Sequence, residues 1–289
     1  MKKLFLCAIV LMAMSLIISV TGCQQPPVPL PAPPPPFEVS VAPEEAYNLP
    51  GEPVEVKFSI TNVSSNPITF DPYPPEIQVS SVSQDEVVFS IPAGTQPLEI
   101  KPGDTIALEF SWDQKDKEGK QIPPGWCDII FNDITVMQGS GQSYGLSPRS
   151  RVLIQYPQGA MEKSFDLNQS QTINDITVTL ERIELTSSGM TVYAFNTPPG
   201  HTPPQGILPT STFLDAFAEY SVDGGVMKQA GSAGLCFLEN GTRYTWKNLD
   251  PLPADAKELT FRIRMRYYDK PEGLLGLWEF KIPLQEVRR

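Results

Sequence analysis

The chain has 289 residues, a formal net charge of −11 and no long basic run, and 40% of its residues are hydrophobic. This length is enough for two domains of ordinary size behind a leader segment. The acidic balance argues against nucleic acid as a partner, because such binding depends on lysine and arginine that neutralise phosphates.

The first 22 residues have the pattern of an export signal, with lysines at 2–3, an apolar run over 4–20 and small residues before Cys23. The sequence "VTGC" at the end of the run resembles a bacterial lipobox. That resemblance implies cleavage by signal peptidase II between Gly22 and Cys23, and acyl chains such as palmitate on Cys23. Two alternatives stay open. One is an uncleaved signal anchor, since the run approaches the roughly 20 residues that span a bilayer. The other is an ordinary secretory signal.

Lipidation of Cys23 would make the protein extracytoplasmic and hold it to the bacterial cell membrane, because two or more acyl chains give stable residence where one does not. Loss of residues 1–22 removes two lysines and brings the charge to −13. An acidic chain is not drawn to anionic lipid, so the acyl chains are the expected membrane contact. Residues 23–36 are the lipid site and a proline-rich spacer, which favours extended polyproline II. The alternative for this tract is a ligand for a partner that recognises proline-rich segments.

Beyond the spacer, apolar and polar residues alternate with period two, which predicts half-buried strands. The clearest runs are "VEVKFSITN" at 54–62, "TIALEFSW" at 105–112, "ITVTLERIEL" at 176–185 and "LTFRIRMRYY" at 259–268. In the third run the alternation changes parity near Glu181-Arg182, which predicts a β-bulge. Turn signals separate the runs, so we expect an all-β chain. The predicted architecture is two immunoglobulin-like antiparallel β-sandwich domains, at 37–156 and 157–289, with the seam in 156–162.

Residues 37–136 resemble the domain of the Bacillus intracellular proteinase inhibitor family. The resemblance is carried by "GEPVEVKFSITNVSSNPITF" and by "LEIKPGDTIALEFSWDQKDKEGKQIPPG". It implies an immunoglobulin-like sandwich. It also implies an alternative function, inhibition of a subtilisin-type protease through loops of the first domain, although no inhibitory residue is carried over.

Residues 162–284 are similar to an uncharacterised β domain found in anti-sigma-factor-like extracytoplasmic proteins of Gram-positive type. The stretches "QTINDITVTLERIELTSSGMTVYAF" and "GLWEFKIPL" carry this resemblance. It implies a fold and brings no activity.

Catalysis is not expected. The stretch "GQSYG" at 141–145 matches G-x-S-x-G and would make Ser143 a nucleophile, but that motif needs a strand-to-helix turn. Strands are expected on both sides of it, which favours a flexible Gly/Ser loop. The single histidine, His201, lies in a proline-rich stretch with no strand to position it against a serine. A serine hydrolase that uses Ser143 is a distant alternative.

No metal and no cofactor are expected either. The stretches "DQKDKEG" at 113–119 and "DLNQSQT" at 166–172 have spaced oxygen ligands, but both depart from calcium-loop spacing, and hairpin loops are favoured. Cys127 and Cys236 fall in different predicted domains and are expected as small buried hydrophobes. A disulfide between the two domains is the alternative.

Three arginines, Arg262, Arg264 and Arg266, alternate along one predicted strand, and we call them the arginine stripe. They are suited to contact with an anion or an acidic partner. The favoured interpretation is a solvated sheet face with cross-strand partners such as Glu181 or Glu279.

Three aromatic residues near the arginine stripe in sequence, Tyr244, Trp246 and Trp278, are suited to stacking a sugar, but their spacing along strands is more typical of a core. Taken together, the sequence predicts a non-catalytic, surface-anchored lipoprotein that acts as a binding module at the cell envelope. Its expected contacts are the membrane through the acyl chains on Cys23, and a surface protein, a protease or a wall polymer.

Overall fold

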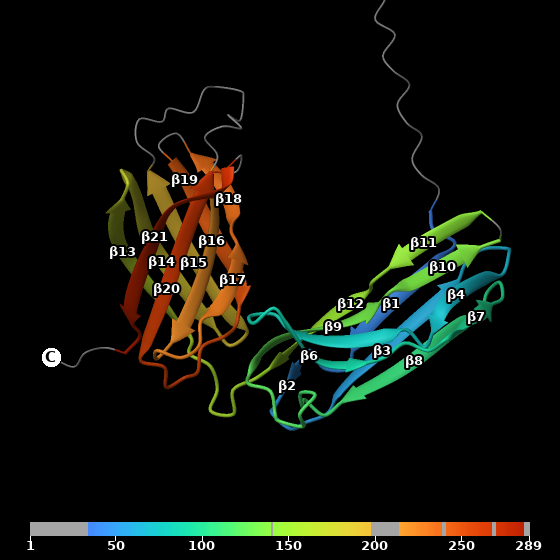
Figure 1. The fold of residues 1–289 in the computed structure, drawn as a ribbon. Coiled ribbons are helices and arrows are strands. Elements are labelled where there is room, and N and C mark those ends of the chain that lie inside the picture. Colours follow the sequence, from blue (N-terminus) through green and yellow to red (C-terminus); the bar gives the residue numbers. More distant parts are fainter. Residues whose placement is uncertain (1–33, 140, 198–213, 239–240, 268–269, 286–289) are drawn as a thin grey trace, which may run out of the picture. The chain divides into compact units, whose positions relative to one another are not determined.

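The structure is a computed structural model that describes residues 34–139, 141–197, 214–238, 241–267 and 270–285 (Figure 1). Every regular element in these ranges is a strand, and the strands form several antiparallel sheets consistent with β-sandwich domains. The all-β prediction is therefore confirmed. Pro36–Arg289 forms one compact unit.

The strands of residues 37–154, which we call the N-terminal β region, build three sheets of order β1-β3-β8, β11-β10-β4-β7 and β2-β12-β9-β5-β6. All the pairs are antiparallel except the short parallel pair of β2 with β12. The bounds are β1 (Phe37–Pro43), β2 (Tyr47–Asn48), β3 (Val54–Asn62), β4 (Ile68–Tyr73), β5 (Glu76–Ser81), β6 (Glu86–Ile91), β7 (Gln96–Ile100), β8 (Thr105–Trp112), β9 (Gly125–Asn132), β10 (Ile134–Gln138), β11 (Gln142–Leu146) and β12 (Arg149–Ile154).

The strands of residues 163–283, which we call the C-terminal β region, build two antiparallel sheets of order β13-β14-β15-β19-β18 and β17-β16-β20-β21. The bounds are β13 (Lys163–Ile173), β14 (Ile176–Thr186), β15 (Gly189–Thr197), β16 (Leu214–Val222), β17 (Lys228–Ser232), β18 (Gly234–Leu238), β19 (Gly241–Leu249), β20 (Glu258–Tyr267) and β21 (Lys270–Pro283).

The buried side chains fall into two hydrophobic clusters, one in each β region. On β3 the alternation is complete, because the apolar residues from Val54 to Ile60 are at most 1% exposed and the polar residues between them face outward. On β20 the apolar side chains from Leu259 to Met265 are fully buried in the same way. The strand prediction for these two segments is confirmed.

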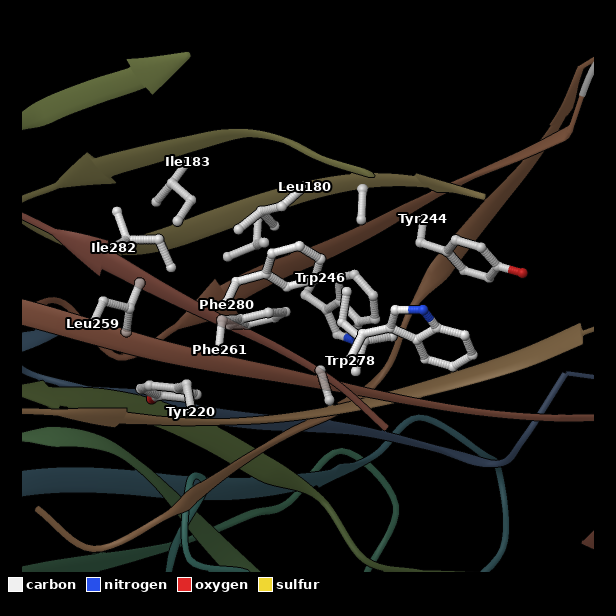
Figure 2. Close-up of a cluster of buried hydrophobic side chains, with 14 of the residues drawn as sticks. Leu180, Ile183, Tyr220, Tyr244, Trp246, Leu259, Phe261, Trp278, Phe280 and Ile282 are labelled. Atoms are coloured by element: carbon white, nitrogen blue, oxygen red, sulfur yellow. The ribbon is translucent and has the colours of Figure 1, made fainter. Parts of the chain in front are cut away.

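Aromatic side chains fill the centre of the hydrophobic cluster in the C-terminal β region (Figure 2). Trp246 meets Phe261 edge to face, with ring centroids 5.4 Å apart, and stacks near Tyr244 at 6.1 Å. Trp278 is also fully buried. Tyr244, Trp246 and Trp278 therefore serve the core, and none of them offers a ring face to a sugar in solution.

Several register shifts interrupt the strands of the C-terminal β region, and two of them bear on the sequence predictions. The register between β14 and β15 shifts between Leu180 and Arg182, which confirms the bulge predicted from the change of parity. The register between β13 and β14 shifts between Asp166 and Gln169, where Asn168 adopts a left-handed φ of 49°. The expectation of a hairpin loop at 166–172 is therefore wrong, because asparagine tolerates this backbone conformation and lets the strand continue through a bulge.

One open side of the C-terminal β region is closed by side chains that reach from sheet to sheet. The Gln171 and Asn174 side-chain amides, at the end of β13, donate to the backbone carbonyls of Glu279 and Leu275 on β21. An edge strand with unpaired carbonyls is a template for unwanted pairing, and these contacts occupy two of its acceptors.

Candidate functional site

An exposed tight turn in the N-terminal β region is the best-defined candidate for a binding site. It spans Tyr47–Glu52, and we call it the pinned turn. Pro50 and Gly51 occupy its two central positions, Gly51 has φ +85°, and the Glu52 N–H donates to the Leu49 carbonyl at 3.2 Å. Proline followed by a residue of positive φ is the signature of a type II turn. The Glu52 carboxylate also accepts the Leu49 N–H at 2.8 Å, so the turn is closed twice.

A single buried side chain from a distant loop pins this turn. Gln114 is fully buried, and its Nε2 donates to the carbonyls of Leu49 and Glu52 at 2.8 and 2.7 Å. Its Oε1 accepts the Gly51 N–H at 3.0 Å and a second bond from Gln121 Nε2. The Gln114 amide therefore replaces water at three backbone groups of the turn, which fixes the shape of a loop that would otherwise fluctuate.

Hydrogen bonds also fix the backbone at the base of the pinned turn. Asn48 is 5% exposed, and its side-chain amide donates to the Glu45 carbonyl at 3.1 Å. Its own carbonyl accepts the Gln155 N–H at 2.9 Å, and the Leu153 N–H donates to Ala46 at 2.8 Å. These bonds run beside the short β2 strand, which pairs with β12 (Figure 1).

The side chains on either side of Asn48 point to solvent. Tyr47 is 48% exposed and Leu49 is 45% exposed, so two large apolar side chains lie on the surface two positions apart. The Tyr47 ring also lies 6.3 Å from the ring of Trp126, centroid to centroid. The pinned turn thus presents an aromatic and an aliphatic side chain on a backbone whose conformation is already fixed, which lowers the entropic cost of binding.

The lipidation site and the histidine of the sequence analysis lie outside the described residues. This applies to Gly22 and Cys23 at the predicted signal peptidase II site, and to His201. Their predictions stay predictions.

Ser143 lies on an exposed strand. It sits in β11 at an edge of its sheet, opposite Met137 of β10, rather than in a strand-to-helix turn. The expectation of a flexible loop at 141–145 is therefore wrong for 142–145, which lie in β11, where Tyr144 packs edge to face on Phe37 at 5.4 Å and helps hold the strand. The placement of Ser143 lacks the backbone geometry that G-x-S-x-G nucleophiles use.

The arginine stripe faces outward on β20 beside acidic side chains of β16 and β21. The ion pairs are Arg262 with Glu279 at 2.6 Å, Arg264 with Glu219 at 3.0 Å and Arg266 with Asp215 at 3.4 Å. The hydrogen bond to Glu279 raises the pKa of Arg262. The Arg266 guanidinium also lies 4.4 Å from the centre of the Phe217 ring. Glu181, named as a candidate partner of the stripe, pairs instead with Arg243 because it belongs to the other sheet.

The two described cysteines are both free and differ sharply in environment. Cys127 on β9 is 2% exposed, and burial, followed by the nearby charge of Asp250, raises its pKa to about 12. Cys236 on β18 is exposed. The expectation of two buried cysteines holds for Cys127 and is wrong for Cys236, because β18 is an edge strand. The alternative of a disulfide between them is not realised in this structure.

Neither acidic stretch, 113–119 or the part of β13 at 166–172, gathers metal ligands. Asp113 pairs with Lys115 at 2.8 Å, and that hydrogen bond lowers the pKa of Asp113. Asp116 accepts the backbone N–H groups of Glu118 and Lys120, as an Asx turn does. Over the part of the chain that the structure describes, no three His, Cys, Asp or Glu side chains are grouped to hold a metal ion. The same residues contain no helix with the length and apolarity to cross a bilayer.

The sequence analysis missed the pinned turn. A local signal was present in "YNLPGE", where a Pro-Gly turn follows a tyrosine and a leucine. The pinning contacts had no local signal, since Gln114 lies 62 to 65 positions from its backbone partners in the turn.

Comparisons with known proteins identify no family for this chain. No protein-family model matches it, and no curated protein matches it.

Solved structures give only distant likenesses. A conserved domain protein from Bacillus anthracis has 11% identity and a TM-score of 0.33, over 88% of this chain and 89% of that one. The sporulation control protein Spo0M from Bacillus subtilis has 10% identity and a TM-score of 0.31, over 86% and 91%. A β-glucosidase from Listeria innocua has 13% identity and a TM-score of 0.27 over 41% of this chain, and the chain spans only 16% of that enzyme. Likenesses this weak carry no argument about function.

Proposed function

We propose that this chain is a lipid-anchored extracytoplasmic protein that binds a partner at the cell envelope and catalyses no reaction. The observation that carries the proposal is the pinned turn, where Tyr47 and Leu49 are exposed on a backbone fixed by Gln114. Aromatic and aliphatic anchors on a preorganised backbone are what a binding surface needs. The lipobox-like "VTGC" and the proline-rich spacer support the location, with the acyl chains on Cys23 as the membrane contact.

The architecture that we propose for this role is two immunoglobulin-like β-sandwich domains, 37–156 and 157–289, carried on the spacer of residues 23–36. The two hydrophobic clusters, one in each β region, support this division. Sandwiches of this kind present loops at their ends while the strands form the scaffold. In this arrangement the pinned turn is a presented loop of the first domain.

The surroundings of the pinned turn define the chemistry of the proposed partner. Glu45 and Glu52 flank the two apolar side chains in sequence and are exposed, and the neighbouring Glu44 is paired with Lys57 at 3.0 Å. A matching surface would offer an apolar pocket with basic groups at its rim, because charge complementarity speeds encounter and excludes wrong partners. We therefore propose a protein partner with such a pocket.

Photo-crosslinking on intact cells tests the binding role. A photoreactive amino acid in place of Leu49 should give a discrete adduct of higher mass with one surface partner. The matched control is the same group in place of Val63, which is 52% exposed on the same β region but lies outside the pinned turn. No adduct at position 49, or the same adducts at both positions, would contradict the proposal.

A second candidate function, inhibition of a subtilisin-type protease, is favoured by one feature of the same turn. A rigid exposed loop with an apolar side chain is suited to occupy a protease cleft without being released as two pieces. Titrating subtilisin with acyl-free protein that begins at Gln24 tests this candidate. Inhibition that Leu49→Asp relieves and Val63→Asp does not would support it. Full protease activity at a large molar excess of the wild-type protein would dismiss it and leave the binding role standing.

A further inference from the structure

The contact between the two β regions is built around a buried carboxylate. Asp250 follows β19 and is 2% exposed. Its Oδ1 accepts the backbone N–H of Trp126 at 2.9 Å, across 124 positions of sequence, and its Oδ2 accepts Lys228 Nζ at 2.8 Å. A buried carboxylate is tolerated only when it is paired and hydrogen-bonded, and both conditions are met here.

The backbone at Gly125 lies so close to the Asp250 carboxylate that only glycine fits at position 125. A Cβ on Gly125 would lie 2.9 Å from Asp250 Oδ2, and the φ of Gly125 is +150°. Glycine at the start of β9 therefore lets the carboxylate reach the Trp126 N–H. The contact therefore joins a side chain of the C-terminal β region, Asp250, to the backbone of the N-terminal β region at Trp126.

Two further hydrogen bonds cross between the β regions at other points. The Trp126 indole Nε1 donates to the Ser188 carbonyl at 3.1 Å, and the Gln229 N–H donates to the Ser83 carbonyl at 2.7 Å. Because the contacts lie at separate points of the C-terminal β region, rotation about one of them would break the others. Two domains on a linker usually move relative to each other unless their interface prevents it.

We infer that the two β regions move as one rigid body, locked by the Asp250–Trp126 contact, with Lys228 of the C-terminal β region holding the carboxylate in place. The Lys228 pair lies within the C-terminal β region and would persist if the regions separated. Separation would instead break the Asp250–Trp126 bond and the two other hydrogen bonds that cross between the regions, so these contacts must be lost together. Rigidity also reaches the pinned turn, since Tyr47 packs against the same Trp126. This inference goes beyond the binding role and does not depend on it.

Backbone ¹⁵N relaxation of the acyl-free protein from Gln24 tests the rigidity directly. We expect one rotational correlation time for amides of both β regions in the wild-type protein. Two different and shorter times, each appropriate to a single β region, would overturn the inference without any variant.

Variants then test the role of Asp250. Asp250→Ala should split the common correlation time into two and raise the rate of proteolytic cleavage within residues 155–162 several-fold, while both sets of dispersed amide signals persist. Asp250→Asn keeps an acceptor for Trp126 and should have a smaller effect. The control is Asp166→Asn, an exposed aspartate of the same β region whose side chain is 82% exposed, and it should change neither readout.

A second substitution covers the case in which Asp250→Ala does not fold. Lys228→Met removes the ammonium, keeps much of the side-chain volume, and should also loosen the two β regions. A single correlation time in every folded variant at positions 250 and 228 would refute the assignment of the lock to Asp250, even if the wild-type protein is rigid.

Discussion

Gln114→Ala offers the sharpest test of how the pinned turn keeps its shape. The substitution removes the amide that receives the Gly51 N–H and donates to the carbonyls of Leu49 and Glu52. Each such bond contributes about 0.5–1.5 kcal/mol net, so three bonds predict a loss of about 2–4 kcal/mol in the free energy of unfolding. For a folded unit of roughly 150–250 residues, in which each 1 kcal/mol shifts the melting temperature by about 2–4 °C, that loss corresponds to a melting temperature lower by roughly 4–16 °C.

The backbone of Gln114 allows the hydrogen bonds to be separated from strain. Its φ is +61°, a left-handed conformation that costs roughly 1 kcal/mol for a residue with a side chain. Gln114→Gly loses the same three bonds but relieves this cost, so it should be about 1 kcal/mol more stable than Gln114→Ala. Both variants should lose the protection of the Gly51 amide against hydrogen exchange.

Urea unfolding measures the loss in the free energy of unfolding, and hydrogen exchange measures the protection of the Gly51 amide. Gln121→Ala is the control. Gln121 is exposed and bonds to Gln114 Oε1 without touching the turn, so its loss should change stability by less than about 1 kcal/mol and leave Gly51 protected. A Gln114→Ala protein that unfolds within 0.5 kcal/mol of wild type, or that keeps a protected Gly51 amide, would refute the reasoning.

Three further predictions concern the anchor, the thiols and the arginine stripe. Cys23→Ala should abolish lipidation and signal peptidase II cleavage, and mass spectrometry of the wild-type protein should find acylated Cys23 as the first residue rather than an intact Met1. In acyl-free protein, iodoacetamide at pH 8 should modify exposed Cys236 within minutes and spare Cys127 until the protein unfolds. Because the folded pKa of Cys127 is raised to about 12 from 9.0, its contribution to stability is present below pH 9. This contribution to the free energy of unfolding is lost as pH rises from 9 to 12, at roughly 1.4 kcal/mol per pH unit. In alkaline unfolding curves, Cys127→Ala should therefore lose less stability over this pH range than the wild-type protein does. Glutamine at all three positions of the arginine stripe should lower the melting temperature modestly and leave surface binding unchanged, so loss of a bound partner by a variant that melts like wild type would point to a binding face instead.

The strands could be predicted from the sequence because the alternation of apolar and polar residues that indicates a strand is a local pattern. Val56, Phe58 and Ile60 alternate with polar residues, and one buried face is enough to produce that period. The bulge in β14 could be predicted for the same reason, since one additional residue reverses the parity of everything after it.

Predictions failed where polar or glycine-rich residues were assumed to break a strand. Asn168 is accommodated in β13 by a left-handed conformation, and the strand resumes after it. Gly145 and its neighbours extend β11 because β10 supplies a partner. Whether a polar segment is a loop or an edge strand depends on a neighbour that is distant in sequence, which local composition does not encode.

The pinned turn and the contact at Asp250 were out of reach of sequence reasoning for one shared reason. In both, a buried polar side chain satisfies backbone groups far away in the sequence, 62 to 65 positions for Gln114 and 124 for Asp250. A glutamine after a strand and an aspartate after another are ordinary residues until the partner backbone is known. Candidate sites of this kind become visible only when hydrogen-bond partners are assigned in the folded chain.

The contacts of Gln114 and of Asp250 should affect different measurements, so each can be tested separately. Gln114 acts inside the N-terminal β region, so Gln114→Ala should expose the Gly51 amide and leave the common rotational correlation time intact. Asp250 acts between the β regions, so Asp250→Ala should split that correlation time and leave Gly51 protected. The Tyr47 ring of the pinned turn packs on Trp126, and an effect could pass from one contact to the other through it. If Asp250→Ala also loosened the turn, binding at Leu49 would depend on the lock between the β regions, and the protein would have to be regarded as one binding unit rather than as a binding domain with an independent neighbour.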